Sequence, residues 1–198
     1  MSVSESQKGI VNTIRDFVER DVIPAASQLE HADEYPVDLV EQMRELGLFG
    51  SLIPEEFGGV GLDVTTYALI IEEICRGWMS LSGILNSHII MAHMVAAHGT
   101  EEQKQRFLPA MATGEKRGGI CITEPNAGSD VQAIQTRATR DGDEYVVNGT
   151  KTLITNGRNG NTFALVVKTD PGADPPRRGM SIFIAEKGPG FNVSRDIA

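Results

Sequence analysis

The amino-acid sequence predicts an α+β protein in which an N-terminal helical bundle is followed by an antiparallel β-barrel or sandwich domain. As far as about residue 117, apolar residues recur at three- and four-residue spacing, which is typical of helices. After residue 118 they recur at every second position, and turn dipeptides separate the short apolar runs. We therefore expect an all-α domain over residues 1–117 and a β domain over residues 118–198.

The helical half contains clear start and stop patterns. An apolar stripe covers residues 10–22, on a helix that Pro24 should kink or end. Thr100 and Gln103 form a capping-box pattern, which predicts the start of another helix. Further helices are expected over residues 36–46, 67–74 and 81–97.

The second half predicts a succession of short strands. Asp141-Gly142 and Asn148-Gly149 are hairpin-turn dipeptides, and they flank a strand over residues 144–147. Other strands are expected at 120–122, 134–140, 150–155, 162–169, 180–185 and from 191 onward. The insert 171–179 is rich in Pro and Gly and predicts a mobile connection. Because no helix of useful length separates two strands, the pattern excludes a parallel dinucleotide-binding sheet.

Composition excludes several classes of function. The chain has 27 acidic against 18 basic residues, a net charge of −9, which argues against nucleic acid as a partner. The most apolar stretch, residues 84–97, is interrupted by polar side chains and is too short to span a membrane. Cys75 and Cys121 lie far apart, so we expect neither a disulfide framework nor a zinc site. Free cysteines are typical of a reducing compartment, so we expect a cytoplasmic location.

The histidines do not predict a metal site either. His88, His93 and His98 are five residues apart, which rotates each about 140° from the last on a helix. They therefore share no ligand face, and we expect them to be packed or solvated.

Two polar segments are the candidates for chemistry. ICITEPNAGSD at 120–130 joins a strand to a loop in which Gly128 can bring backbone close to a ligand, while Thr123 and Ser129 supply hydroxyls. KTLITNG at 151–157 ends an apolar run at Thr155. These segments are either two polar turns of a β domain or the cradle of a planar, heteroatom-rich ligand. Spacing alone does not choose between the two interpretations.

Four collinear motifs resemble the acyl-CoA dehydrogenase family. They are ELGLFGSLIPEEFGGVGLD at 45–63, HGTEEQKQRFLPAMATGEK at 98–116, CITEPNAGSD at 121–130 and VNGTKTLITNG at 147–157. The resemblance covers nearly the whole chain. It implies the N-terminal and middle domains of that fold, incomplete because the family's C-terminal helical domain is absent.

The resemblance also implies FAD as cofactor and assigns residues to it. The residues expected to contact the flavin ring or the FAD pyrophosphate are Ile120, Ile122, Thr123, Gly128, Ser129, Leu153, Ile154 and Thr155. Ser129 and Thr169 are expected to contact the CoA part of the substrate. Many relatives have an aromatic residue where this chain has Ile120 and a Trp where it has Leu153, so aromatic stacking on the flavin is lost here.

The implied reaction is FAD-dependent α,β-dehydrogenation of an acyl-CoA to a 2,3-enoyl-CoA. The implied partners are the acyl-CoA substrate, an electron-transfer flavoprotein and, in a homotetramer, other copies of the chain. No catalytic residue is expected within this chain. Glu124 is the nearest candidate base, but its place inside the loop motif favours a structural role, and the base is expected in the missing domain.

Two other functions remain open at this level. The same architecture serves flavin-dependent oxidases and monooxygenases, in which reduced flavin meets oxygen. A non-catalytic or split subunit that binds a partner or acyl-CoA would also explain the absence of a base.

Overall fold

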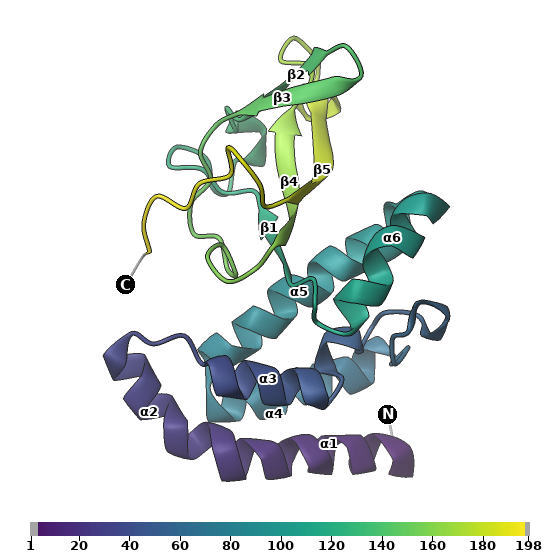
Figure 1. Ribbon diagram of the computed structural model, residues 1–198, viewed down its shortest axis with the longest axis vertical. Coiled ribbons are helices and arrows are strands. Elements are labelled where there is room, and N and C mark those ends of the chain that lie inside the picture. Colours follow the sequence, from purple (N-terminus) through teal and green to yellow (C-terminus); the bar gives the residue numbers. More distant parts are fainter. Residues whose placement is uncertain (1–3, 197–198) are drawn as a thin grey trace. The chain divides into compact units, whose positions relative to one another are not determined.

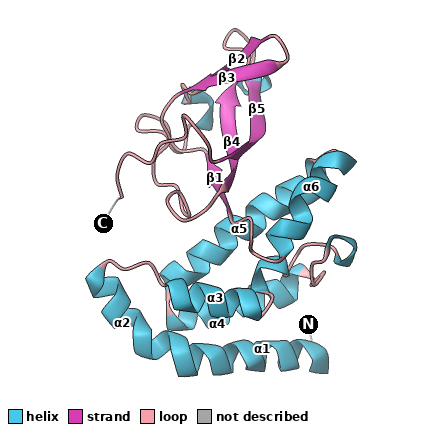
Figure 2. Ribbon diagram, viewed as in Figure 1, coloured by secondary structure: helices cyan, strands magenta, loops and turns pink. Residues whose placement is uncertain are grey.

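The computed structural model describes residues 4–196, and the chain divides between Lys116 and Arg117 into two compact units. Figure 1 labels the helices and strands of both units. Figure 2 colours the chain by secondary structure and shows α-helices in the first unit and strands joined by long loops in the second.

The first unit is built from six α-helices and a π-helical turn among its described residues. These elements are α1 (Glu5–Phe17), η1 (Val18–Val22), α2 (Ile23–Ala32), α3 (Val37–Glu45), α4 (Val64–Gly77), α5 (Met79–His98) and α6 (Glu101–Ala112). Two short 3₁₀ helices, η2 (Leu48–Gly50) and η3 (Glu55–Phe57), lie between α3 and α4. The capping box predicted at Thr100 and Gln103 is confirmed, with both reciprocal hydrogen bonds present at the start of α6.

Pro24 was predicted to kink or end the first helix, and Figure 1 shows a bend between α1 and α2, although the chain stays helical through η1. Phe17 and Val22 keep right-handed helical backbone angles, and η1 connects α1 to α2 without a break. The π turn changes the hydrogen-bond register, so Pro24 falls in the first turn of α2, where its missing N–H is tolerated. The helix ends instead at Asp33, which adopts a left-handed conformation with φ 54°.

Apolar side chains from α1, α3, α4 and α5 form the core of the helical unit. Phe17, Met43, Ile70 and Leu85 are among its buried members. By length and composition helix α5 is long and apolar enough to cross a membrane, but half of its apolar stretch is buried inside the protein. Core helices share this length and composition.

The histidines of α5 are packed or exposed, as predicted. His88 is buried, with its Nε2 3.1 Å from the Phe49 carbonyl oxygen and its ring edge-on to the Phe49 ring. His93 and His98 are exposed. Within residues 4–196, no three His, Cys, Asp or Glu side chains are grouped so as to hold a metal ion.

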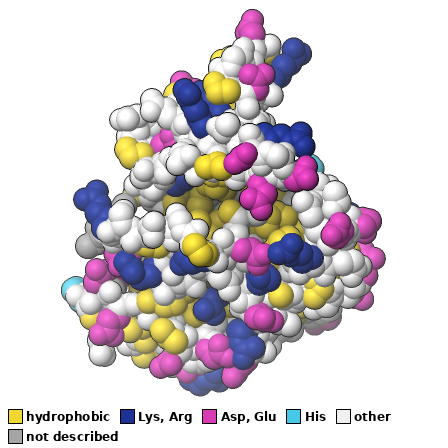
Figure 3. Space-filling view, turned by 45° about the horizontal axis from the view of Figure 1, so that its top comes forward, with side chains coloured by type: hydrophobic (Ala, Val, Ile, Leu, Met, Phe, Trp, Pro, Cys, Tyr) yellow, Lys and Arg dark blue, Asp and Glu magenta, His cyan; other side chains and the backbone are white. Residues whose placement is uncertain are grey.

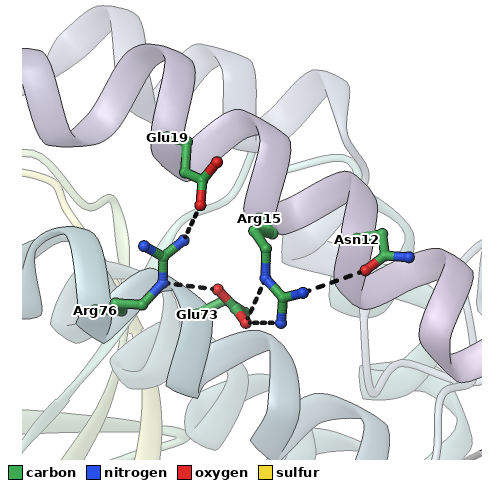
Figure 4. Close-up of polar contacts among 5 residues, drawn as sticks. All are labelled: Asn12, Arg15, Glu19, Glu73 and Arg76. Atoms are coloured by element: carbon green, nitrogen blue, oxygen red, sulfur yellow. Dashed lines mark hydrogen bonds and ion pairs between the residues drawn. The ribbon is translucent and has the colours of Figure 1, made fainter.

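A charged network joins α1 and η1 to α4 (Figure 4). Glu73 of α4 is 8% exposed and accepts hydrogen bonds from Arg15, at 2.5 and 3.0 Å, and from Arg76, at 3.0 Å. Arg76 also reaches Glu19 at 3.2 Å. The hydrogen bond from Arg15 is the largest cause that lowers the pKa of Glu73, so its carboxylate stays charged and holds the two helical segments together.

Replacing Glu73 with Gln tests this network. We expect Glu73→Gln to lower the free energy of unfolding by roughly 1–3 kcal/mol at pH 7, because two arginines lose a mostly buried carboxylate partner. Chemical denaturation measures the change. Glu41→Gln is the matched control, since Glu41 pairs with Arg44 on an exposed part of α3, and it should change stability by less than about 0.5 kcal/mol. Equal losses in the two variants would contradict the account.

The second unit contains a five-stranded sheet. Its strands are β1 (Gly118–Cys121), β2 (Arg137–Asp141), β3 (Glu144–Asn148), β4 (Thr162–Lys168) and β5 (Met180–Glu186). Strand β4 pairs antiparallel with β5 along its whole length and parallel with β1 from Thr162 to Leu165. It pairs with β2 at Lys168, also in the parallel sense, and β2 forms a hairpin with β3.

The sheet is therefore mixed and open, and the prediction of a purely antiparallel barrel or sandwich is wrong in this respect. A helix is the usual crossover between parallel strands. Here the β2–β3 hairpin and the loop after it return the chain, so β4 runs parallel to β1 with only a short 3₁₀ turn, Val131–Ala133, and no α-helix between them.

Two predicted strands are absent from the described residues. Residues 150–155 form no strand, because Leu153 adopts φ 56° and Asn156 adopts φ 64°, left-handed conformations that do not fit an extended ladder. Residues 191–193 are also not a strand, and the Phe191 ring stacks instead on Phe163 with centroids 5.1 Å apart. The insert 171–179 contains a 3₁₀ turn, Pro176–Gly179, whereas its mobility stays a prediction.

Candidate functional site

The segment after β1 folds back on itself in a tight turn. The Glu124 amide donates to the Ala127 carbonyl at 2.9 Å, and the Ala127 amide donates to the Glu124 carbonyl at 3.1 Å. Pro125 occupies the corner, where its fixed φ suits the turn. Ala127 is buried against Ile134 and Val166, so the turn is anchored to the core while the residues after it are exposed.

The loop 151–157 is hydrogen-bonded both to β1 and to the segment that follows it. The Thr152 amide donates to the Thr123 carbonyl at 2.9 Å, and the Asn156 Nδ2 donates to the Gly118 carbonyl at 2.8 Å. Gly119 permits the close approach, because a Cβ there would lie 2.6 Å from the Thr155 carbonyl oxygen. The two candidate segments therefore lie side by side.

A buried ion pair joins the same two segments. The Lys151 Nζ lies 2.8 Å from the Glu124 Oε1 and 2.9 Å from the Ile122 carbonyl oxygen. The Lys151 and Glu124 side chains are only 8% and 6% exposed. Glu124 also accepts from the Gln135 amide at 2.6 Å, the Thr136 amide at 3.0 Å and the Thr136 hydroxyl at 2.5 Å.

These contacts decide the protonation state of Glu124. Burial acts to raise its pKa, but hydrogen bonds from Lys151 and Thr136 and from two backbone amides outweigh it and lower the pKa to about 2. A carboxylate this acidic is a poor proton acceptor near neutral pH. The geometry thus supports the structural role that the sequence favoured for Glu124.

Three hydroxyls of the two segments form what we call the rim: Ser129 and Thr155 are exposed, and Thr123 is half-buried. Within residues 4–196, the side chains of Thr123, Ser129 and Thr155 make no hydrogen bond to other protein groups. In the same loop as Thr155, Leu153 is 68% exposed and has a left-handed backbone. An apolar side chain held in solvent by a costly backbone conformation is typical of a ligand-contacting position.

The remaining residues predicted to contact FAD lie in the same two segments. Ile120 is on β1, Ile122 follows it, and both are half-buried. Gly128 is exposed beyond the tight turn, and Ile154 is half-buried in the loop. The structure thus brings all eight predicted flavin contacts into two adjoining segments.

Thr169 lies apart from these segments in the chain but at a related place in the sheet. Because β1 and β4 are parallel, Thr169, which follows β4, lies toward the same end of the strands as Thr123. Its hydroxyl is already engaged, 2.8 Å from the Ser181 hydroxyl and 3.3 Å from the Gly179 carbonyl oxygen.

Sequence reasoning missed Lys151 and Thr136. A lysine beside a polar turn is an ordinary surface pattern, and Thr136 resembled any strand threonine. The only signal was Glu124 itself, because a carboxylate assigned a structural role inside a loop motif requires donors from elsewhere.

A shallow hollow of about 470 Å³ opens beside Glu124 and Thr136. The side chains of Asn126, Gln135 and Asn148 line it, so its walls are largely amide and hydroxyl groups. This lining does not suit an aliphatic acyl chain.

Acidic and basic side chains are interspersed over the face drawn in Figure 3.

Comparisons with known proteins agree with this architecture. Residues 4–115 match the family model "Acyl-CoA dehydrogenase, N-terminal domain" and residues 119–198 match "Acyl-CoA dehydrogenase, middle domain". The short-chain-specific acyl-CoA dehydrogenase of Clostridium acetobutylicum is 38% identical over 196 residues, which cover 98% of this chain and 51% of that protein.

Solved structures give the same result. The acyl-CoA dehydrogenase of Geobacillus kaustophilus is similar with a TM-score of 0.89 and 38% identity, over 95% of this chain and 50% of that chain. A chain in the structure of the electron transferring flavoprotein of Acidaminococcus fermentans has a TM-score of 0.90 and 36% identity, over 96% of this chain and 50% of its own length.

The fold defines a two-unit chain, with a helical unit followed by a unit built on a mixed sheet. The chain belongs to the acyl-CoA dehydrogenase family. It spans about half the length of the curated relatives it matches.

The lowered pKa of Glu124 predicts an acid-sensitive fold. Because the folded pKa of about 2 lies below the ordinary value of 4.5, the pair stabilises the protein fully above pH 4.5, and this stabilisation is lost as the pH falls toward 2. The loss should be on the order of 3 kcal/mol. Urea unfolding from pH 7 to pH 2.5 measures it. Glu124→Gln should be less stable at pH 7 and should show a flatter profile below pH 4.5, and an unchanged profile would contradict the assignment.

Gly119 provides a steric test of how the two segments approach each other. Gly119→Ala should lower the free energy of unfolding by roughly 1–3 kcal/mol, because its Cβ would meet the Thr155 carbonyl and the Phe163 ring. Gly188→Ala is the matched control, since a Cβ there meets nothing within 4 Å, and it should be neutral within about 0.5 kcal/mol. Thermal denaturation of both variants makes the comparison. Equal stability of the two would show that residues 119 and 155 are not in close contact.

Proposed function

We propose that this chain forms the FAD-binding part of an enzyme that oxidises an acyl-CoA to its 2,3-enoyl-CoA. The observation that carries the proposal is the rim of unpartnered hydroxyls at Thr123, Ser129 and Thr155 around the exposed Leu153. Family membership supports acyl-CoA dehydrogenation in general. The particular substrate is part of the proposal.

The residues of the rim fit a flavin chemically. The Thr123 and Thr155 hydroxyls can donate to ring heteroatoms, and Leu153 offers an apolar surface to one face of the ring. Gly128 and Ser129, exposed after the tight turn, suit the FAD pyrophosphate, while Ser129 and Thr169 would also serve the CoA part of the substrate. The isoleucines Ile120, Ile122 and Ile154 supply apolar packing beneath. When bound, FAD accepts the hydride from the β-carbon of the thioester.

The α-proton of an acyl thioester requires a positioned general base. Glu124 is a carboxylate beside the rim, yet it is buried, fully hydrogen-bonded and strongly acidic. The proposal therefore places the base outside the described residues. The same engagement of Glu124 is what favours the second candidate, a split or non-catalytic subunit that binds acyl-CoA or a partner.

In the same proposal, electrons pass to an electron-transfer flavoprotein, the protein assembles as a homotetramer, and it resides in the cytoplasm. The alternative is a flavin-dependent oxidase or monooxygenase of the same architecture, in which reduced flavin reacts with oxygen.

An anaerobic visible spectrum of the purified protein with FAD, taken before and after addition of a mixture of acyl-CoAs, tests the proposed reaction. An oxidised flavin spectrum that acyl-CoA leaves unchanged is expected of these residues alone, because the proposal places the base outside them. Bleaching of the flavin band would show that a base is supplied to the site. Rapid reoxidation of the reduced protein by air would favour the oxidase, and failure to bind FAD would contradict the proposal.

A single hydroxyl tests the placement of the flavin. Thr123→Val removes one donor without changing the size of the side chain and should weaken FAD binding about three- to tenfold, the value of one hydrogen bond. Thr139→Val, on an exposed position of β2, is the matched control and should leave binding unchanged. Fluorescence titration with FAD measures both affinities. Equal affinities would remove Thr123 from the flavin site.

A further inference from the structure

We propose that Lys151 and Glu124 are a positioning pair, which sets the spacing between the turn 121–130 and the loop 151–157 and thereby determines how tightly the protein binds FAD. Neither residue is assigned contact with the cofactor. The inference rests on the proposed function, since it concerns the same rim. It adds two residues that lie beneath the rim and act through its backbone.

The contacts of the pair connect three stretches of chain. Glu124 belongs to the turn, its backbone donors Gln135 and Thr136 precede β2, and Lys151 begins the loop. Lys151 also donates to the Ile122 carbonyl at 2.9 Å, one residue before Thr123. The pair therefore fixes the peptide that presents the Thr123 hydroxyl.

The neighbouring backbone contact strengthens the argument. The Thr152 amide donates to the Thr123 carbonyl, so consecutive residues of the loop, Lys151 and Thr152, bind the consecutive carbonyls of Ile122 and Thr123. A shift of the loop by one residue would break both contacts and would change the exposure of the Leu153 side chain. The side-chain pair and the backbone bond thus specify one register for the two segments.

Stability alone does not explain a buried ion pair at this place. Burying two charges costs several kcal/mol of desolvation, and well-packed apolar residues often stabilise a fold equally well. A buried polar pair does, however, specify a unique arrangement, because any other register leaves charges without partners. At a rim whose hydroxyls must match a rigid ring, that specificity has direct consequences for ligand affinity.

The charges of the pair provide a discriminating test. If Lys151 acted by attracting the anionic FAD phosphates, Lys151→Met would weaken binding, whereas Glu124→Gln would expose the lysine charge and strengthen it. If the pair acts through geometry, both substitutions weaken binding. The two mechanisms therefore predict opposite signs for Glu124→Gln.

The experiment measures FAD dissociation constants and the flavin absorption spectrum for the purified wild-type protein, Lys151→Met and Glu124→Gln. We expect both variants to bind FAD about tenfold or more weakly and to shift the flavin band, because small displacements of positioning groups are costly. Glu73→Gln is the control for general destabilisation, since it breaks a mostly buried network in the helical unit. It should lower stability and leave the FAD constant and spectrum unchanged.

Folding of the variants is checked by far-UV circular dichroism. If Lys151→Met does not fold because Glu124 is left without its cation, the double variant Lys151→Met/Glu124→Gln decides, as it carries no unpaired buried charge. Weak FAD binding by the folded double variant supports the proposal. Wild-type affinity in that variant, or stronger binding by Glu124→Gln, overturns it. Absence of FAD binding by the wild-type protein contradicts the proposed function itself.

Discussion

The carboxylate of Glu124 gathers hydrogen bonds from a lysine ammonium, a threonine hydroxyl and two backbone amides, and it does so from a nearly solvent-free position. Unpaired, such a charge would be strongly destabilising, so every donor must be in place when the unit folds. The tight turn after β1, the start of β2 and the loop that begins at Lys151 are thereby bound to one point. The contacts of Glu124 therefore fix the backbone that carries the rim residues.

The sheet provides the frame for that arrangement. Parallel pairing of β1 with β4 sends the chain after Cys121 and the chain after Lys168 toward the same end of the strands. Gly119 lets the loop lie against β1, with backbone atoms closer than any side chain would allow. The site therefore uses strand ends and loops on a rigid scaffold, the usual location of ligand-contacting groups in β domains.

Much of the fold could be predicted from local pattern, and the failures have physical causes. Capping residues and period-two alternation depend on near neighbours, which is why the helix start at Thr100 and the strands β3, β4 and β5 were predicted close to their observed bounds. Strand partners depend on the whole chain, so the parallel β1–β4 pair was not foreseen. The left-handed backbone of Leu153 has no local signal, because leucine rarely adopts it.

The site shows the same division between local and tertiary information. Family motifs identified the rim residues. Lys151 was not identified, because it lies 27 residues from Glu124 in the sequence and only the folded structure brings its Nζ within 2.8 Å of the Glu124 carboxylate. The most direct test of the account is a crystal structure of the protein with FAD. The account predicts the flavin ring against Leu153, within hydrogen-bond reach of the Thr123 and Thr155 hydroxyls, above an intact ion pair. A flavin bound elsewhere, or bound at the rim with the pair broken, would contradict it.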